Sequence, residues 1–411
     1  MTTNLPSDRH FRLVLRRALL NATLVVAALV VGLCIAEIAL RLIGFSYPPF
    51  HQPDSITGLS LRPNTSGWYR KEGQAYVATN SQGLRDRERP IAKPPGTYRV
   101  AILGDSMSEA LQVDVEKTFW RLLEQRLEAC GFRSAKHIDV INLGVSGFGT
   151  GQALRILQTR GLAYQPDLVI LAFFPGNDVR NNSRELEPDK MRPFYVLDAA
   201  GRLRLDDTFA RSTEFRRRTG RLRRAGKSLS RYLRSLQLIY YVKDLRDMKR
   251  EQADAAATPA AGAPAPARPV GEVGLDDQIF RDPQDQKWQD AWRLTERLIL
   301  ELKQTAASAR AEFAVVIMSI GIQVHPDKVV REAFARRLGV EDLSYPERRL
   351  VQFGERTNTR VISLVPDLQR HAERNNVYLH GFTNTSLGSG HLNEAGHAAD
   401  AEIIGARLCR G

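Results

Sequence analysis

The sequence predicts an α/β fold in which about five parallel strands form a sheet between two layers of helices, preceded by one transmembrane helix. Two observations lead to this prediction. From Tyr98 onward, short apolar runs, Gly-rich turns and amphipathic stretches alternate, which is typical of a parallel sheet flanked by helices. Near the N-terminus, residues 18–36 form an uncharged apolar run that is long enough to cross the hydrocarbon core of a bilayer.

Each predicted strand is a short apolar run that ends in a turn. The predicted strands are residues 98–103, 138–143, 168–174, 313–319 and 360–364. The predicted helices follow amphipathic stretches, at residues 118–129, 151–162, 288–307, 345–356 and 393–408. This alternation of strands and helices places the main domain at residues 98–411.

The composition is that of a folded protein with one strongly basic segment. The 411 residues are 43% hydrophobic and 26% charged, and the net charge is +13. Residues 211–250 hold fourteen Lys or Arg against three acids, a difference of +11. Because the charge is confined to one segment and no zinc-finger or recognition-helix pattern accompanies it, the sequence argues against a nucleic-acid-binding protein.

The apolar run is expected to be a retained membrane anchor over residues 18–43. A signal-peptide core is usually shorter, although Ala36 and Ala39 leave cleavage open. Four arginines precede the run, so the positive-inside bias places residues 1–17 in the cytoplasm and the chain after residue 45 outside it. Lipid attachment at Cys34 is not expected, because the bulky Leu33 precedes it.

Two stretches do not show the alternation of predicted strands and helices. Residues 44–97 are expected to be a lead-in that links the membrane to the domain. Residues 185–284 are expected to be an insertion whose Ala/Pro-rich run at residues 253–269 is a flexible loop. Within its basic part, an amphipathic helix is predicted from apolar residues at helical spacing: Leu229, Leu233, Leu236 and Tyr240.

The three cysteines give no disulfide framework and no C-x-x-C pair for metal or redox work. If the main domain is exported, Cys130 and Cys409 could pair. Their wide separation in sequence provides no geometric reason for it.

Polar residues follow the first three predicted strands of the sheet, at the edge where open α/β sheets bind ligands. Gly-Asp-Ser, ending in Ser106, follows the first strand, and Asn177 follows the third. After the second strand a glycine-rich turn includes Gly147. Near the C-terminus, HLNEAGH places His391 just before the last helix. A metal site is not indicated, because no acidic or cysteine ligand completes a zinc pattern with His391 and His397, and His397 is expected to be structural.

Taken together, Gly-Asp-Ser, the turn at Gly147, Asn177 in GND and His391 in HLNEAGH resemble the four motifs of the SGNH (GDSL-like) hydrolase family. The resemblance covers about residues 98–180 and 288–408. It implies a flavodoxin-like sheet, Ser106 as nucleophile, His391 as base and no cofactor. It also implies an oxyanion hole made of the Ser106 amide, the Gly147 amide and the Asn177 side chain. A Gly-x-Ser-x-Gly elbow, which the α/β-hydrolase alternative would need, is missing from the sequence.

One position departs from the family pattern. Gly388 stands where members usually carry an aspartate three residues before the histidine. No acid nearby in sequence replaces it. Either a backbone carbonyl or a distant carboxylate orients His391, or the enzyme uses a Ser-His dyad, or activity is lost.

The expected function is ester chemistry on O-acyl groups, acetyl above all, of an envelope glycan, by hydrolysis or by transfer. The resemblance is to the membrane-anchored bacterial type, and with the predicted topology it implies a single-pass inner-membrane protein whose catalytic domain is periplasmic or otherwise extracytoplasmic. Two alternatives stay open, a catalytically silent module that binds glycan or scaffolds a polysaccharide assembly, and a lipase or thioesterase. For residues 211–250 we expect either a solvated face or contact with anionic lipid or acidic polysaccharide.

Overall fold

The computed structural model describes residues 8–257 and 276–410, which form two compact units. Among the described residues, the first unit comprises residues 8–49 and 224–257, and the second comprises residues 50–223 and 276–410. Most of the Ala/Pro-rich run expected to be flexible lies outside the described residues.

The second unit is built on one five-stranded sheet in the order β11-β10-β7-β5-β6, in which every neighbouring pair is parallel. The strands are β5 (Thr97–Leu103), β6 (His137–Asn142), β7 (Leu168–Phe173), β10 (Glu312–Ile317) and β11 (Arg360–Ser363). All residues of the central strand β7 are buried, which explains its continuous apolar sequence. The predicted α/β fold with five parallel strands is confirmed.

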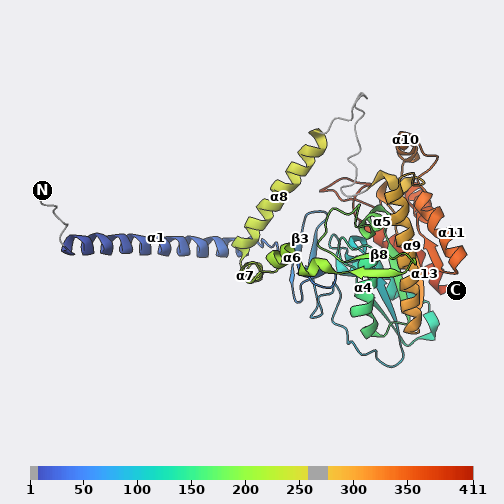
Figure 1. The fold of residues 1–411 in the computed structure, drawn as a ribbon, viewed down its shortest axis with the longest axis horizontal. Coiled ribbons are helices and arrows are strands. Elements are labelled where there is room, and N and C mark those ends of the chain that lie inside the picture. Colours follow the sequence, from blue (N-terminus) through green and yellow to red (C-terminus); the bar gives the residue numbers. More distant parts are fainter. Residues whose placement is uncertain (1–7, 258–275, 411) are drawn as a thin grey trace. The chain divides into compact units, whose positions relative to one another are not determined.

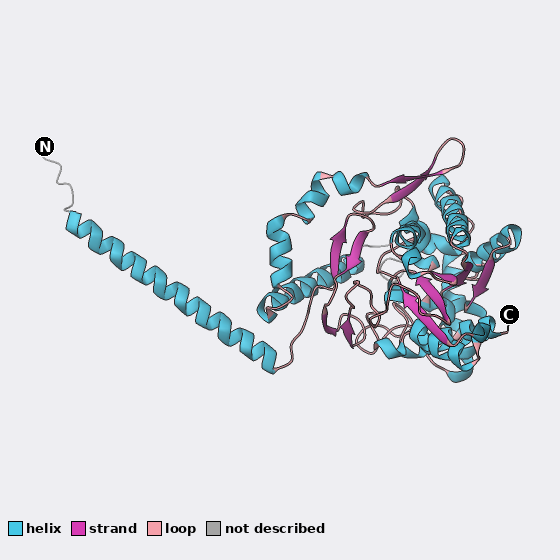
Figure 2. Ribbon diagram, turned by 90° about the horizontal axis from the view of Figure 1, so that it is seen from below, coloured by secondary structure: helices cyan, strands magenta, loops and turns pink. Residues whose placement is uncertain are grey.

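Helices cover both faces of this sheet (Figures 1 and 2). On one side α3 (Phe119–Ala129) packs against α13 (Glu394–Cys409), and on the other α9 (Gln286–Ser308) packs against α4 (Thr150–Thr159) and α5 (Pro175–Asn182). Further helices of this unit are α10 (Lys328–Leu338), α11 (Tyr345–Thr357) and α12 (Val365–Asn375). The sequence prediction located five of these eight helices and missed α5, α10 and α12.

Periodicity and capping explain why α9 forms where it does. Its residues at Trp288, Trp292, Leu298 and Leu302 are buried, so one stripe faces the core. The Asp285 side chain accepts a hydrogen bond from the Lys287 amide and so caps the first turn.

The lead-in segment is part of the second unit from Phe50 onward. It forms two antiparallel hairpins, β1 (His51–Asp54) with β2 (Gly58–Leu61) and β3 (Ser66–Tyr69) with β4 (Ala75–Ala78). A small core fixes the hairpins to Leu111 of the sheet domain, and its other members are Phe50, Leu61, Ala75 and Val77. This segment was expected only to link the membrane to the domain.

The insertion contains a hairpin of β8 (Phe194–Leu197) and β9 (Leu203–Asp206), followed by α6 (Thr213–Arg218), α7 (Arg221–Leu229) and α8 (Arg234–Ala257). Of the apolar positions that predicted one helix, Leu229 ends α7, Leu233 lies between the two helices, and Leu236 and Tyr240 lie in α8. The chain leaves helical conformation between Leu229 and Arg234.

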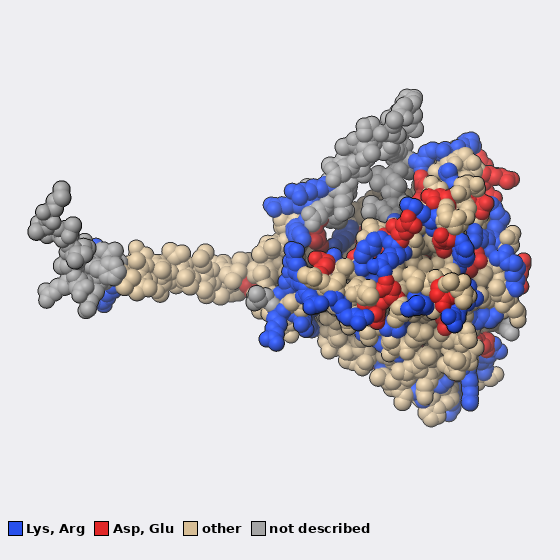
Figure 3. Space-filling view, in the orientation of Figure 1, with Lys and Arg blue, Asp and Glu red and all other residues tan. Residues whose placement is uncertain are grey.

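In the first unit, α1 (Asp8–Leu42) contains residues 15–42, a stretch that is long and apolar enough to cross a membrane. Its exposed side chains over this stretch are almost all uncharged (Figure 3). A signal sequence would share these properties.

A disulfide joins Cys130, just after α3, to Cys409, the last residue of α13. The two Cα atoms lie 6.3 Å apart, within the range that a disulfide spans. The fold therefore supplies the proximity that sequence separation could not indicate. The remaining cysteine, Cys34, is exposed.

Candidate active site

Strand β5 delivers Ser106 to the carboxyl edge of the sheet. After the strand, Gly104 leaves no room for a side chain, because a Cβ there would lie 2.3 Å from the Ser108 hydroxyl. The buried Asp105 then caps α2 (Ser106–Glu109) by accepting a 3.0 Å hydrogen bond from the Met107 amide. Ser106 is the one residue of α2 that is not buried, so its hydroxyl can be reached from solvent.

Asn177 lies at the neighbouring strand end, in the first turn of α5. Its Nδ2 donates a 2.9 Å hydrogen bond to Oδ2 of Asp105, which joins the end of β7 to the end of β5. An asparagine side chain has a second N–H, and this bond leaves it available. Burial raises the pKa of Asp105. The hydrogen bonds from Met107 and Asn177 and the charge of His391 act to lower that pKa, but burial has the larger effect. His391 is therefore within electrostatic reach of the residue that precedes Ser106.

The turn that contains Gly147 is held from two sides. The Gly147 carbonyl accepts hydrogen bonds from Nη1 of Arg192 at 2.9 Å and Nδ2 of Asn181 at 3.2 Å. On the other side, the Ser146 hydroxyl donates to the carboxylate of Glu109 on α2. Gly147 has a φ of +75°, a left-handed conformation that glycine adopts without steric cost.

His391 lies in a loop that the buried His380 stabilises. His380 contacts the Gly390 carbonyl through Nδ1 at 2.9 Å and the Ser319 hydroxyl through Nε2 at 2.9 Å. Burial lowers the pKa of His380 to about 4, so this ring is neutral at physiological pH. The Gly381 amide donates to the His391 carbonyl at 2.9 Å, and Asn393 caps α13 directly afterwards.

The carboxylate of Glu72 orients the His391 ring. Its Oε2 contacts Nδ1 of His391, and its Oε1 accepts a 2.8 Å hydrogen bond from the His391 amide. Burial acts to raise the pKa of Glu72, but its contacts with His391 hold that pKa below the usual value. With the Nδ1 proton donated to Glu72, the neutral ring keeps Nε2 unprotonated and able to accept a proton. Of the alternatives left open at Gly388, the structure selects the distant carboxylate.

Gly388 itself has no room for an acid. Its φ is +83°, and a Cβ there would lie 2.9 Å from Cδ2 of His325 and 3.2 Å from the Tyr378 ring. The missing aspartate is therefore matched by a backbone conformation that disfavours any side chain.

The turn that carries Glu72 is locked onto the loop before His391. The Gly73 amide donates to Oδ1 of Asn384 at 2.9 Å, and Nδ2 of Asn384 donates back to the Gly73 carbonyl at 3.1 Å. Gly73 packs so tightly that a Cβ would lie 2.5 Å from the Gln112 carbonyl oxygen. The β3–β4 hairpin, the segment after α2 and the His391 loop are thus interlocked.

A second histidine–carboxylate pair lies behind the Gly147 turn. Nε2 of His51 is 2.8 Å from Oε1 of the fully buried Glu109, which also accepts the Ser146 hydroxyl. Burial opposes the charged form of both groups, yet the contact with Glu109 raises the pKa of His51 and the contact with His51 lowers that of Glu109. His51, like Glu72, comes from the lead-in segment.

Sequence reasoning missed Glu72, Glu109 and His51. The alternation of apolar and polar residues in 66–78, around a turn at Glu72 and Gly73, weakly indicates a hairpin. It does not indicate which histidine Glu72 contacts. His397, expected to be structural, is buried, accepts a 3.3 Å hydrogen bond from the Phe119 amide and stacks on the Phe119 ring. Across the part of the chain that the structure describes, no group of three His, Cys, Asp or Glu is placed to hold a metal ion.

The structure therefore contains a hydroxyl that solvent can reach, an imidazole ordered by a carboxylate, and an asparagine N–H donor at the neighbouring strand end. These are the groups that acyl transfer from an ester requires. The Ser106 hydroxyl makes no hydrogen bond to any described residue, and such bonds are often long before substrate binds.

No protein-family model matches the sequence, and a search of curated proteins found no match. In fold the chain is similar to several solved hydrolases. An acetyl xylan esterase, AlAXEase, is 12% identical with a TM-score of 0.37, and the match covers 75% of this chain and 98% of that one. For a GDSL-like lipase from Bacteroides thetaiotaomicron the identity is 9%, the TM-score 0.32 and the coverage 76% and 88%. A lipase/acylhydrolase from Enterococcus faecalis is 12% identical with a TM-score of 0.35, and the match covers 76% of this chain and 96% of that one. Likenesses this distant do not decide activity, which depends on the site itself.

Proposed function

We propose that the chain is a serine-dependent ester hydrolase or acyltransferase in which Ser106 is the nucleophile and His391 the base. The observation that carries the proposal is the contact of the Glu72 carboxylate with Nδ1 of His391. A carboxylate in this position fixes the imidazole tautomer that can take a proton from a serine and stabilises the imidazolium that forms.

In the proposed reaction Oγ of Ser106 attacks the ester carbonyl carbon while Nε2 of His391 takes the hydroxyl proton. The tetrahedral oxyanion is stabilised by the amides of Ser106 and Gly147 and by the free N–H of Asn177. The C–O bond to the alcohol then breaks, and His391 returns the proton to the leaving oxygen. Water or an acceptor hydroxyl then attacks the acyl-Ser106 ester and gives its proton to His391. As the bond between the acyl carbon and Oγ breaks, His391 passes this proton to Oγ and Ser106 is regenerated.

The proposed substrate is an O-acyl group, acetyl above all, on a glycan of the bacterial envelope. Two features support a site outside the cytoplasm. The chain has an apolar helix that could anchor it at the inner membrane, and the arginines in the first turns of this helix favour a cytoplasmic N-terminus. The Cys130–Cys409 disulfide is typical of an oxidising compartment such as the periplasm.

The silent-module alternative rested on Gly388, which removes the usual acid from the histidine motif. Glu72 supplies a carboxylate to the same ring nitrogen, so this argument against catalysis loses its basis. A lipase or thioesterase would use the same catalytic groups. The ester or thioester substrate that the protein hydrolyses distinguishes these alternatives from an enzyme that acts on acylated glycan.

The test is p-nitrophenyl acetate turnover by the full chain in detergent, beside Ser106→Ala, His391→Ala and the control Ser386→Ala at an exposed serine. We expect turnover that the first two substitutions abolish and the control keeps, and a fluorophosphonate adduct on Ser106. Turnover that survives Ser106→Ala, or an unlabelled Ser106, would overturn the proposal. Acetate release from an acetylated glycan, with and without an acceptor oligosaccharide, then separates hydrolysis from transfer.

A further inference from the structure

The start of α8 is fixed to the end of α1. The Glu37 carboxylate of α1 accepts hydrogen bonds from the backbone amides of Arg234 and Ser235, each at 3.0 Å. These are among the amides at a helix N-terminus that lack a partner within the helix, so a side chain of α1 caps α8. In addition, Nη2 of Arg41 donates a 2.6 Å hydrogen bond to the Tyr232 carbonyl.

The next turns of α8 are fixed to the segment that directly follows α1. The Tyr47 amide donates to Oε1 of Gln237 at 2.7 Å, and the Tyr47 hydroxyl donates to Oδ2 of Asp244 at 2.8 Å. The Tyr241 ring makes edge contacts with Phe45 and Tyr47. Residues 234–244 therefore lie against the last turns of α1 and the few residues that follow it.

These tethers use one side of α8, and a different surface forms on the opposite side. At about 100° per residue, Gln237, Tyr241 and Asp244 project in one direction. Six other residues project roughly the other way and line an open hollow of about 630 Å³: Leu238, Ile239, Val242, Lys243, Arg246 and Arg250. We call these six residues the α8 face.

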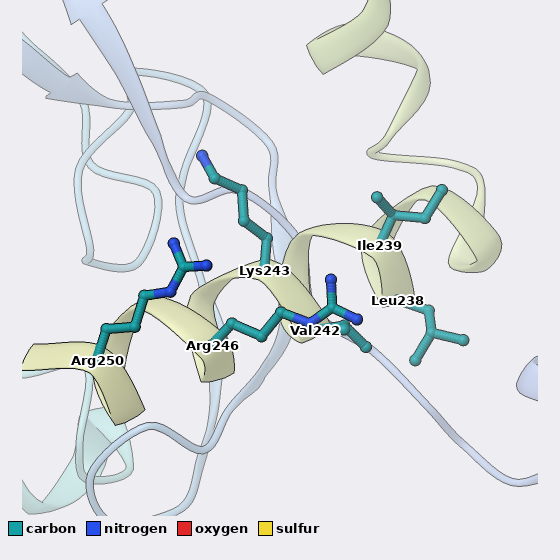
Figure 4. Close-up of a pocket in the computed structure, with 6 residues that line it drawn as sticks. All are labelled: Leu238, Ile239, Val242, Lys243, Arg246 and Arg250. Carbon is teal, nitrogen blue, oxygen red and sulfur yellow. The ribbon is translucent and has the colours of Figure 1, made fainter. Parts of the chain in front are cut away.

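The α8 face is ordered along the helix, with its apolar residues towards the start of α8 and its cations farther along (Figure 4). Ile239 is 63% exposed, and Leu238 and Val242 are exposed as well. Within the described residues, Lys243, Arg246 and Arg250 make no ion pair. Apolar side chains followed by cations on one helix face are typical of a helix that lies in a membrane interface.

We propose that the α8 face docks on the membrane surface, with Leu238, Ile239 and Val242 among the lipid chains near the headgroups and the three cations on anionic lipid phosphates. The occupant is lipid because the tethers place the start of α8, where the apolar residues of this face lie, beside the end of the helix that is proposed to span the membrane. This inference rests on that proposed anchoring, although not on the esterase activity. Basic residues near an anionic leaflet are attracted to it without any specific lipid structure.

The experiment measures the depth of single nitroxide labels on the full chain in vesicles that contain phosphatidylglycerol. The label on Cys34→Ser/Ile239→Cys reports the α8 face, the label on native Cys34 reports α1, and Cys34→Ser/Val329→Cys on exposed α10 is the matched aqueous control. Oxygen concentrates in lipid and a water-soluble nickel complex stays in water, so collisions with each report the depth of a label. We expect the labels at 34 and 239 to collide with oxygen and not with the nickel complex, and the label at 329 to collide with the nickel complex. Raising the ionic strength should weaken the protection of position 239 in the protein that keeps the three cations. In Lys243→Gln/Arg246→Gln/Arg250→Gln the protection should already be weaker at low ionic strength and should no longer depend on salt.

The outcomes separate the docking from the anchoring. A label at 239 that is as open to nickel as that at 329, while Cys34 is protected, overturns the docking alone. A label at Cys34 that is open to nickel overturns the anchoring and this inference with it. If position 239 stays in water and is immobilised only by added acidic polysaccharide, the face binds glycan and the lipid proposal is wrong.

Discussion

Glu72 holds the His391 ring from a hairpin turn that precedes it by 319 residues. The acid and the histidine come from segments that the chain brings together only through the fold. Because the same carboxylate binds both the ring nitrogen and the backbone amide of His391, it fixes the position of the residue as well as the tautomer of its ring.

Replacing Glu72 by glutamine should lower kcat for p-nitrophenyl acetate by about 10² to 10⁴, with little change in KM, because the wrong imidazole tautomer becomes populated. Glu72→Asp should recover part of the loss. The matched control is Glu394→Gln, an exposed acid just after His391 that pairs with Lys117. A Glu72→Gln enzyme with wild-type kcat would show that His391 does not depend on this carboxylate.

Asn177→Ala should lower kcat by about 10² to 10³, equivalent to about 2.7 to 4 kcal/mol, if its free N–H stabilises the oxyanion. The substitution also removes the hydrogen bond to Asp105, so the unfolding temperature should be measured beside the rate. Asn375→Ala, at an exposed position in α12, is the control. An unchanged kcat would remove Asn177 from the proposed oxyanion hole.

The sheet could be predicted because each strand is a short apolar run whose burial on both faces leaves a continuous pattern in sequence. Ser106 and Asn177 could be located for the same reason, since each follows such a run directly. The hairpins of residues 51–78 leave only a weak alternation in sequence, because their strands have four residues, and that alternation does not indicate which distant loops they contact. The partner of His391 therefore stayed undetermined, although the missing acid at Gly388 showed that a partner was needed.

Helices α5, α10 and α12 were missed for a related reason. The α5 sequence, PGNDVRNN, is rich in turn-forming residues, and its helix is fixed by Pro175 in its first turn and by packing on α9. Local propensity there indicates a loop, and tertiary contacts decide otherwise.

The double substitution Cys130→Ser/Cys409→Ser should lower the free energy of unfolding by about 2 to 4 kcal/mol, because the disulfide closes a long loop. Esterase activity at 25 °C should persist, since the bond lies at the far end of α13 from His391, about 24 Å away at 1.5 Å per residue. Thermal unfolding with and without reductant measures the effect, and Cys34→Ser is the control. Two maleimide-reactive thiols in unreduced, denatured Cys34→Ser protein would show that the bond does not form.

Asp400 in α13 should contribute less to the stability of the sheet domain as pH rises. Its side chain is fully buried, both of its oxygens lack a hydrogen-bond partner among the described residues, and burial raises its pKa well above the usual value. An acid whose pKa is raised by folding stabilises the fold fully below its unfolded pKa and loses that contribution as pH rises through the folded pKa. Within this window the unfolded chain has released the proton while the folded chain keeps it, so stability falls by about 1.4 kcal/mol per pH unit.

Asp400→Asn removes this titration, so we expect the variant to gain stability relative to the wild type between pH 5 and pH 8. Thermal unfolding of the full chain in detergent at both values measures the difference. Glu402→Gln, on the exposed side of the same helix, controls for the loss of one charge. If the difference between Asp400→Asn and the wild type is the same at both pH values, then Asp400 does not hold its proton in the folded chain, and an unseen partner must neutralise its charge.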